Sequence, residues 1–138
     1  MPALAAEGFD ARNLARLAQR LARANAALEL LVDGAERYLA LRAPGPGHSG
    51  FDAGAFAGLA EEIQVRLLLR AIDRVGHEGP AELGKVEALA AALSRAGAQK
   101  PAPKGRIRLK QTLAGALVTF VDGRIRIEPA PPRRSRPG

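Results

Sequence analysis

The chain has 138 residues, a formal net charge of +7 and no cysteine. That length allows one domain or two small ones, and the lack of cysteine excludes disulfides and thiolate metal sites. No apolar run approaches the roughly 18 residues that cross a membrane, and the first ten residues lack the basic and apolar regions of a signal peptide. We therefore expect a cytoplasmic protein without a membrane partner.

The positive charge is concentrated late in the chain. Residues 1–42 carry a net charge of +1 and residues 43–99 carry −2, whereas residues 100–138 hold ten basic and two acidic side chains, for +8. Arginine outnumbers lysine 17 to 4, as a GC-rich genome alone would produce. A codon bias acts along the whole chain, however, so the asymmetry indicates a localised basic surface.

Residues 10–42 are predicted to form one long helix, with Asp10 as its N-cap. Its apolar residues recur at alternating spacings of three and four, which places them on one stripe that packs against partner helices. The stripe consists of Leu14, Leu17, Leu21, Ala24, Leu28, Leu31 and Ala35, with Tyr38 continuing it.

The charged residues of this helix are divided between its two halves. Four arginines form a ridge in the first half, namely Arg12, Arg16, Arg20 and Arg23. Three acidic residues occupy the second half, namely Glu29, Asp33 and Glu36. Because the helix as a whole is nearly neutral, we interpret the arginine ridge as a solvated face.

A Pro- and Gly-rich linker at 43–58 follows, and we expect Phe51 and Phe56 to anchor it to the core. A second helix is predicted at 59–75, with Gly76 as its stop. Its inner face consists of Ile63, Leu67, Ala71 and Val75, with Leu68 and Ile72 beside them. A different face carries Arg66, Arg70 and Arg74.

A third helix is predicted at 80–96. Pro80 suits a first helical turn, and Gly97 suits the end of the helix. The residues expected to face inward are Val86, Leu89, Ala90 and Leu93.

The pattern changes from helical to alternating after a second linker at 100–105. Residues 106–110 alternate strictly between basic and apolar. Segments 117–121 and 124–128 flank Asp122-Gly123, the strongest short signal for a hairpin. A two-residue turn there predicts one apolar face, with Phe120 opposite Ile125 and Val118 opposite Ile127, and one polar face, with Val121 opposite Arg124 and Thr119 opposite Arg126.

The predicted fold class is therefore mainly α, a three-helix array followed by a small C-terminal β-hairpin unit. We divide the chain into a helical linker and helical substrate-recognition domain at 1–99, a small β unit at 100–128, and a basic disordered tail at 129–138.

No catalytic, cofactor-binding or metal-ligating residues are identified. His48 and His77 lie in glycine-rich connections without further ligands at suitable spacing. The glycine-rich stretch 45–50 lacks the Gly-Lys-Ser/Thr ending of a phosphate loop. Glu61 and Glu62 are adjacent, so they point to different sides of the helix, and we interpret them as residues favoured by the helix dipole.

The late basic segment is the remaining candidate for function. If the alternating segment is extended, its three cations share one face, and two more lie on the polar face of the hairpin. The alternative is that any half-buried sheet has a polar outer face, but acidic residues would serve that purpose equally. We therefore predict RNA or DNA contact. The candidate residues are Arg106, Arg108, Lys110, Arg124, Arg126, Arg133 and Arg134.

Motifs at residues 1–4, 17–41 and 50–76, and two more at 112–115 and 123–129, together resemble the part of bacterial tRNA(Ile)-lysidine synthetases that follows their ATP-binding domain. Residues 1–4, Met-Pro-Ala-Leu, look like the Leu-Met-Pro-x-Leu stretch before the long linker helix of that family, and residues 17–41 look like the helix itself. Residues 50–76 are similar to its Leu-Pro-Glu-Glu…Arg-x-Leu…Val-Gly segment, through Glu61-Glu62 and Arg66-Leu67.

The end of the chain carries the same resemblance. Thr112-Leu113-Ala114-Gly115, followed by Gly123-Arg124-Ile125-Arg126-Ile127-Glu128-Pro129, looks like the family ending Thr-Leu-Gly-Gly…Gly-x-Leu-x-Ile…Glu-Pro. The chain departs from the family in lacking the Ser-Gly-Gly-x-Asp-Ser motif for ATP and the catalytic domain around it. We therefore expect a fragment or a truncated gene, and no catalytic residue is carried over.

The resemblance implies a parent protein that uses ATP to attach lysine to the wobble cytidine of the isoleucine tRNA with a CAU anticodon. It implies that this chain binds and orients the tRNA, while ATP, and Mg with it, belong to the missing catalytic domain. The alternative is a protein-interaction domain that forms a homodimer through the Leu14–Ala35 stripe and has no affinity for RNA.

Overall fold

A computed structural model describes residues 3–41, 50–100 and 102–132. The elements in chain order are α1 (Ala3–Leu41), β1 (Phe51–Asp52), α2 (Ala53–Ala57), α3 (Glu61–Val75), α4 (Leu83–Ala98), β2 (Ile107–Leu113), β3 (Ala116–Val121) and β4 (Arg124–Pro129). The mainly α class with a β unit after the helices is confirmed. Within the described ranges, no helix is long and apolar enough to span a bilayer.

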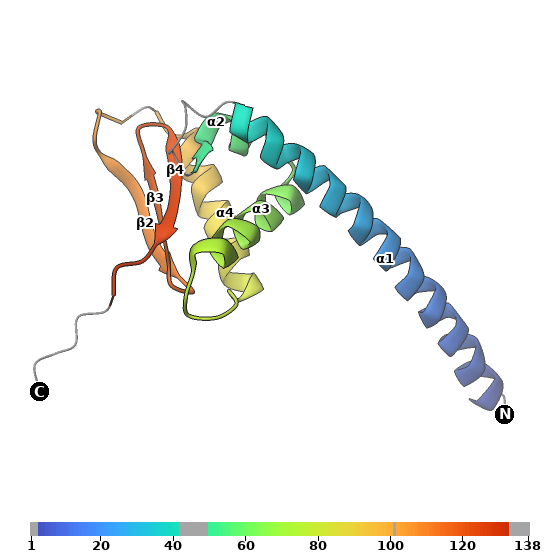
Figure 1. The fold of residues 1–138 in the computed structure, drawn as a ribbon. Coiled ribbons are helices and arrows are strands. Elements are labelled where there is room, and N and C mark those ends of the chain that lie inside the picture. Colours follow the sequence, from blue (N-terminus) through green and yellow to red (C-terminus); the bar gives the residue numbers. More distant parts are fainter. Residues whose placement is uncertain (1–2, 42–49, 101, 133–138) are drawn as a thin grey trace, which may run out of the picture.

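The β unit is a four-stranded antiparallel sheet with strand order β1-β4-β3-β2 (Figure 1). Its β3–β4 hairpin has the predicted register, with Phe120 paired to Ile125 and Val118 to Ile127. Asp122 and Gly123 both have positive φ, as a type I′ turn requires. The sheet is larger than the predicted hairpin because β2 pairs with β3 and because the short β1, within the predicted linker, pairs with the edge of β4.

The predicted helices are confirmed, with corrections at their ends. α1 begins at Ala3, so Asp10 lies inside the helix and is not its N-cap. α4 begins at Leu83, so Pro80 precedes it, and Gly97 lies within its last turn. The end of a helix depends on a few local hydrogen bonds, and the residue types alone do not determine which of these bonds form.

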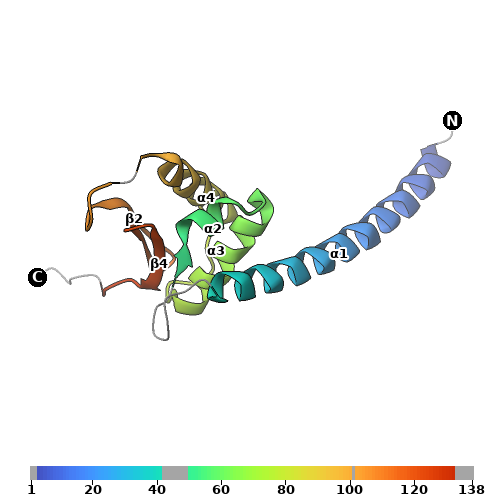
Figure 2. The same cartoon turned by 90° about the horizontal axis from the view of Figure 1, so that it is seen from above.

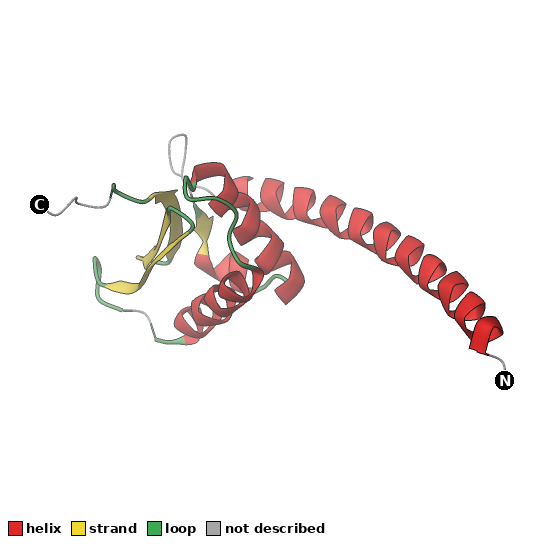
Figure 3. Cartoon of the chain, turned by 90° about the horizontal axis from the view of Figure 1, so that it is seen from below, coloured by secondary structure: helices red, strands yellow, loops and turns green. Residues whose placement is uncertain are grey.

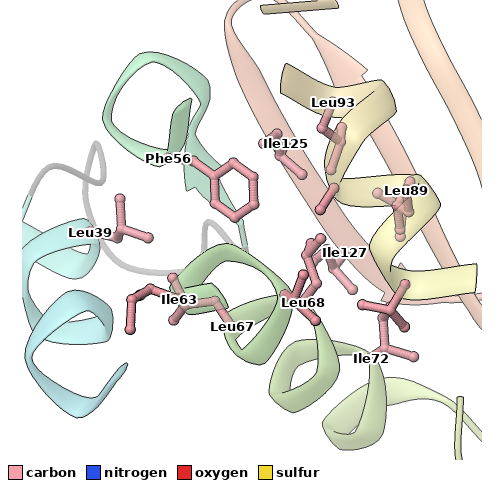
Figure 4. Packing of buried hydrophobic residues seen from close by; sticks show 14 of the residues in the cluster. Leu39, Phe56, Ile63, Leu67, Leu68, Ile72, Leu89, Leu93, Ile125 and Ile127 are labelled. Atoms are coloured by element: carbon pink, nitrogen blue, oxygen red, sulfur yellow. The ribbon is translucent and has the colours of Figure 1, made fainter. Parts of the chain in front are cut away.

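One hydrophobic core joins the helices to the sheet (Figure 4). Phe56 of α2 is buried as predicted and stacks on the half-buried Phe51, with 5.8 Å between ring centroids. A buried polar residue of α3, Gln64, donates through Nε2 to the carbonyl of Phe56 at 2.9 Å and accepts a hydrogen bond from Ser94 of α4 at 3.5 Å. The side chain thus ties three helices together without leaving its amide unsatisfied. The inward residues predicted for α4 are all buried, namely Val86, Leu89, Ala90 and Leu93.

The long helix α1 is only partly attached to this body (Figures 1 and 2). Its buried residues lie near its C-terminal end and are Val32, Ala35 and Leu39. Every residue from 10 to 27 is exposed, and we call this stretch the arm. The predicted apolar stripe is therefore exposed along the arm, where Leu14, Leu17 and Leu21 are 52–64% accessible.

The body contacts only part of the predicted stripe, since Ala35 is buried and Leu28 packs against the core as expected. Leu31 and Tyr38 were expected to face partner helices, but they are 60% and 45% exposed, and their neighbours Val32 and Leu39 are buried instead. A straight α-helix drifts by about 20° per heptad relative to a strict three-four repeat. A stripe extrapolated from Leu14 has therefore rotated partly away from the body, so that Ala35 is still buried while Leu31 and Tyr38 are exposed.

Two glycines meet where the helices join the sheet. Gly76 ends α3 as predicted, but its backbone is extended, and a Cβ there would lie 2.4 Å from the carbonyl oxygen of Ala114. Gly115, in the β2–β3 turn, has φ of +80°, and a Cβ there would lie 2.6 Å from the backbone nitrogen of His77. The backbone N–H of Glu78 donates a hydrogen bond to the carbonyl oxygen of Ala114 at 3.3 Å. Both glycines thus permit a close backbone contact between α3 and the sheet.

Candidate nucleic-acid interface

A β-bulge in β2 divides the predicted basic ridge. Ile107 pairs with Val121 and Leu109 with Phe120, so two steps along β2 match one step along β3 and Arg108 is the extra residue. A bulge reverses the alternation of side chains beyond it. Arg108 and Lys110 consequently do not share one face, which corrects the expectation drawn from strict alternation.

The outer face of the sheet, away from the helices, carries two of the candidates in one row. Lys110 of β2 pairs with Thr119 of β3, which pairs with Arg126 of β4. We call these three residues the basic row. Lys110 and Arg126 are both exposed. Two acidic residues lie on the same face, namely the exposed Glu128, two positions beyond Arg126, and the half-buried Asp52 of β1, which pairs with Arg124.

The outer face has no aromatic side chain among the described strands. Its residues are Asp52, Ile107, Lys110, Thr112, Leu117, Thr119, Val121, Arg124, Arg126 and Glu128. Sequence-tolerant binding of single-stranded nucleic acid uses aromatic residues on which bases stack. This face instead offers charge to a phosphate backbone.

Arg108 is committed to the fold. Its Nη1 donates to the carbonyl oxygens of Ala96 at 2.7 Å and Gln99 at 3.3 Å, at the C-terminal end of α4. Its guanidinium carbon lies 5.9 Å from the ring centroid of Phe120. A cation at this end of a helix satisfies free carbonyl groups and opposes the helix dipole. These contacts give Arg108 a structural role.

Arg106 lies apart from the basic row. It is exposed and lines a cleft of about 270 Å³ between the end of α4, the segment before β2 and the β3–β4 turn. The backbone of that segment is fixed by Asp122, whose Oδ1 accepts a hydrogen bond from the N–H of Gly105 at 2.7 Å. Arg106 and Arg108 thus line the same cleft at the edge of the sheet.

Arg124 is half-buried on the outer face, opposite Asp52 of β1. Its Nε and Nη2 are inaccessible to solvent and have no hydrogen-bond partner in the described part of the chain. Arg133 and Arg134 lie outside the described residues. Of the seven predicted residues, the structure thus brings Lys110 and Arg126 together on one exposed face.

An ion-pair ladder between α1 and α3 was not predicted. Arg66 donates to Glu29 at 2.7 Å, and Arg74 donates to Glu36 at 3.1 Å. Arg70 lies between them and contacts three carboxylates, those of Glu29, Asp33 (2.7 Å) and Glu36 (3.1 Å). The arginines and the acids were each recognised in the sequence, but a pairing across 34–41 positions leaves no local signal.

The ladder changes the acidity of its members. Hydrogen bonds from Arg70 and then from Arg66 hold the pKa of Glu29 below its ordinary value of 4.5. Hydrogen bonds to Glu29 and then to Asp33 raise the pKa of Arg70. Because the shift of Glu29 favours its charged form in the folded state, the shift stabilises the fold above pH 4.5, and this contribution falls as the pH drops through the lowered pKa.

We therefore expect acid to weaken the attachment of α1. The free energy of unfolding, measured with urea between pH 7 and pH 3, falls below about pH 4.5. Glu29→Gln removes part of this pH dependence, because a neutral amide cannot titrate. Glu87→Gln, at an exposed glutamate of α4, is the control and leaves the profile unchanged. Equal profiles for both variants would contradict the role of Glu29.

Among the described residues, no group of three or more His, Asp or Glu side chains is arranged so that it could hold a metal ion. His77 directs its Nε2 to the carbonyl of Ala130 at 3.4 Å. His48 lies outside the described residues. Glu62 accepts a hydrogen bond from Arg66 at 2.9 Å, one turn further along α3.

Comparison with known proteins identifies relatives along nearly the whole chain. The chain is 61% identical over 147 residues to a tRNA(Ile)-lysidine synthase of Bradyrhizobium diazoefficiens, covering 99% of the chain and 41% of the relative. It is 62% identical over 136 residues to the synthase of Rhodopseudomonas palustris, covering 99% of the chain and 39% of the relative. The chain corresponds to a portion of tRNA(Ile)-lysidine synthase. This confirms the resemblance drawn from the sequence motifs.

More distant tRNA(Ile)-lysidine synthases match over the same extent. That of Methylobacterium sp. strain 4-46 is 40% identical over 136 residues, covering 97% of the chain and 38% of the relative. The chain thus spans about two fifths of the length of these synthases. No family model and no solved structure matches it.

Neither these synthases nor the described structure supports a homodimer through the Leu14–Ala35 stripe.

Proposed function

We propose that this chain is the tRNA-recognition part of a tRNA(Ile)-lysidine synthase and that the basic row contacts the tRNA backbone. The observation that carries the proposal is that the exposed Lys110 and Arg126 lie in one row across the sheet, on either side of Thr119, in a chain that is 60–62% identical to three such synthases. The lack of aromatic residues on this face favours contact with phosphates over stacking with bases.

The proposed mechanism is binding and orientation. Phosphate contacts fix the position of the tRNA without reading its sequence. The complete synthase then ligates lysine to the wobble cytidine of the isoleucine tRNA with a CAU anticodon, in the cytoplasm. On this proposal ATP and Mg are held by the three fifths of the protein that the chain does not span.

Substitutions in the basic row test the proposal. We expect Lys110→Glu and Arg126→Glu each to weaken binding of bulk tRNA by about tenfold at low salt, because each replaces a phosphate-neutralising cation with an anion. Each also reduces the slope of log K against log salt by about one. Fluorescence anisotropy with labelled tRNA at several salt concentrations measures both effects.

The same face supplies a control of opposite sign. Glu128→Lys removes an exposed acidic residue of the outer face and should tighten binding. Circular dichroism verifies that each variant folds. The proposal fails if the unmodified chain has no salt-dependent affinity for tRNA, or if all three substitutions leave the affinity unchanged.

A further inference from the structure

We infer that the arm of α1 is a second RNA-contacting surface, through the arginine ridge Arg12, Arg16, Arg20 and Arg23. The inference rests on the proposed function and extends it to a part of the molecule on the far side of the helical body from the sheet (Figure 3). It also reverses the sequence-based interpretation of this ridge as a solvated face.

The arm of α1 carries a net positive charge that the charge of the whole helix conceals. The ridge was discounted because the acidic second half of the helix makes α1 nearly neutral. The structure shows that those acids, Glu29, Asp33 and Glu36, are neutralised by arginines of α3 in the ion-pair ladder. The arm is left with four arginines and a single acid, Asp10, for a net charge of +3 over 18 residues.

The arginine ridge lies on one side of α1. Successive residues of an α-helix are rotated by about 100°, so the four arginines fall within an arc of about 80°. The stripe that contacts the body further along α1 is centred roughly 130° away. The ridge therefore faces away from the side by which α1 is attached, and all four arginines are exposed.

The shape of the ridge also suits RNA. From Arg12 to Arg23 the ridge extends for about 16 Å at 1.5 Å per residue. It lies on the part of α1 that extends away from the body (Figures 1 and 2). A linear array of cations suits a linear array of anions, such as the phosphates along one strand of an RNA helix. An RNA that also reaches the basic row must extend past the body, as a whole tRNA can.

The test compares two double variants with the same change in charge. Arg16→Glu/Arg20→Glu alters the arm, and Lys85→Glu/Arg95→Glu alters exposed residues of α4. We expect the arm variant to bind labelled tRNA about tenfold more weakly at low salt and to lose about two from the magnitude of the salt slope. The α4 variant loses at most two- to threefold through long-range charge alone.

A milder variant separates contact from disruption of the helix. Arg16→Gln/Arg20→Gln adds no acid to the arm and should give an intermediate loss, with helicity by circular dichroism unchanged. Equal losses of tRNA affinity for the arm and α4 variants overturn the inference, as does an arm variant that keeps the tRNA affinity of the unmodified chain. If the basic row variants lose affinity while the arm variants do not, the inference fails and the proposed function stands. If the unmodified chain binds no tRNA, both fail.

Discussion

Gly115→Ala should destabilise the fold by about 3–4 kcal/mol. The new Cβ would lie 2.6 Å from the backbone nitrogen of His77 and 3.0 Å from that of Glu78, and neither atom belongs to a flexible side chain. The φ of +80° adds strain of its own, since alanine rarely adopts it. Urea unfolding monitored by circular dichroism measures the loss.

Gly123→Ala is the matched control. Gly123 lies in the other tight turn of the sheet with a similar φ of +72°, but no atom lies within 4 Å of the position its Cβ would take. We expect a cost of about 1–2 kcal/mol from the backbone conformation alone. The difference between the two variants is the contribution of the close contact between α3 and the sheet. Equal losses would show that this contact is dispensable.

The same contact explains two motifs of the sequence. Gly76 ends one of the segments that resemble the lysidine synthetases, and Gly115 ends another. In the structure these two glycines lie in the same junction, where each leaves room for the backbone of the other segment. A sequence motif of this kind records a contact between distant segments, although the sequence alone does not say which segments meet.

The hairpin was predictable because its determinants are local. Asp122-Gly123 specifies the turn, and alternation on both sides specifies which residues face the core, so the predicted pairs of β3 and β4 are those observed. The bulge at Arg108 was not predictable in this way. It accompanies contacts of the Arg108 side chain with Ala96 and Gln99 of α4, and alternation within β2 carries no sign of them.

The candidate interface was predictable only in part for the same reason. Net charge indicates a basic surface within residues 100–138, but the number of cations on one face depends on the register of every strand. The bulge leaves Lys110 with Arg126 and turns Arg108 towards α4. The charge of the arm depends in turn on which acids are already paired, and those pairs join α1 to α3.

Arg70→Met should destabilise the protein by about 2 kcal/mol and loosen the attachment of α1 to the body. Arg70 is 24% exposed and joins three carboxylates, so its removal leaves those charges close together without their shared cation. Arg70→Lys keeps the charge but loses the fork of donors, and we expect it to recover part of the loss. Arg95→Met, at an exposed arginine of α4, is the control.

A double-mutant cycle isolates the pair from other effects of Arg70. Arg70→Met and Asp33→Asn, made singly and together, give a coupling energy that we expect to reach about 1 kcal/mol. Hydrogen exchange adds a local measurement, because the ladder holds the C-terminal third of α1 on α3, whereas the arm is exposed and contacts α3 near its end, where Asn25 accepts a hydrogen bond from Arg66 at 2.7 Å. Arg70→Met should therefore reduce protection at residues 28–41 and leave the core strands protected. If the single effects are additive and hydrogen exchange at residues 28–41 is unchanged, apolar packing of Val32 and Leu39 alone holds α1 on the body.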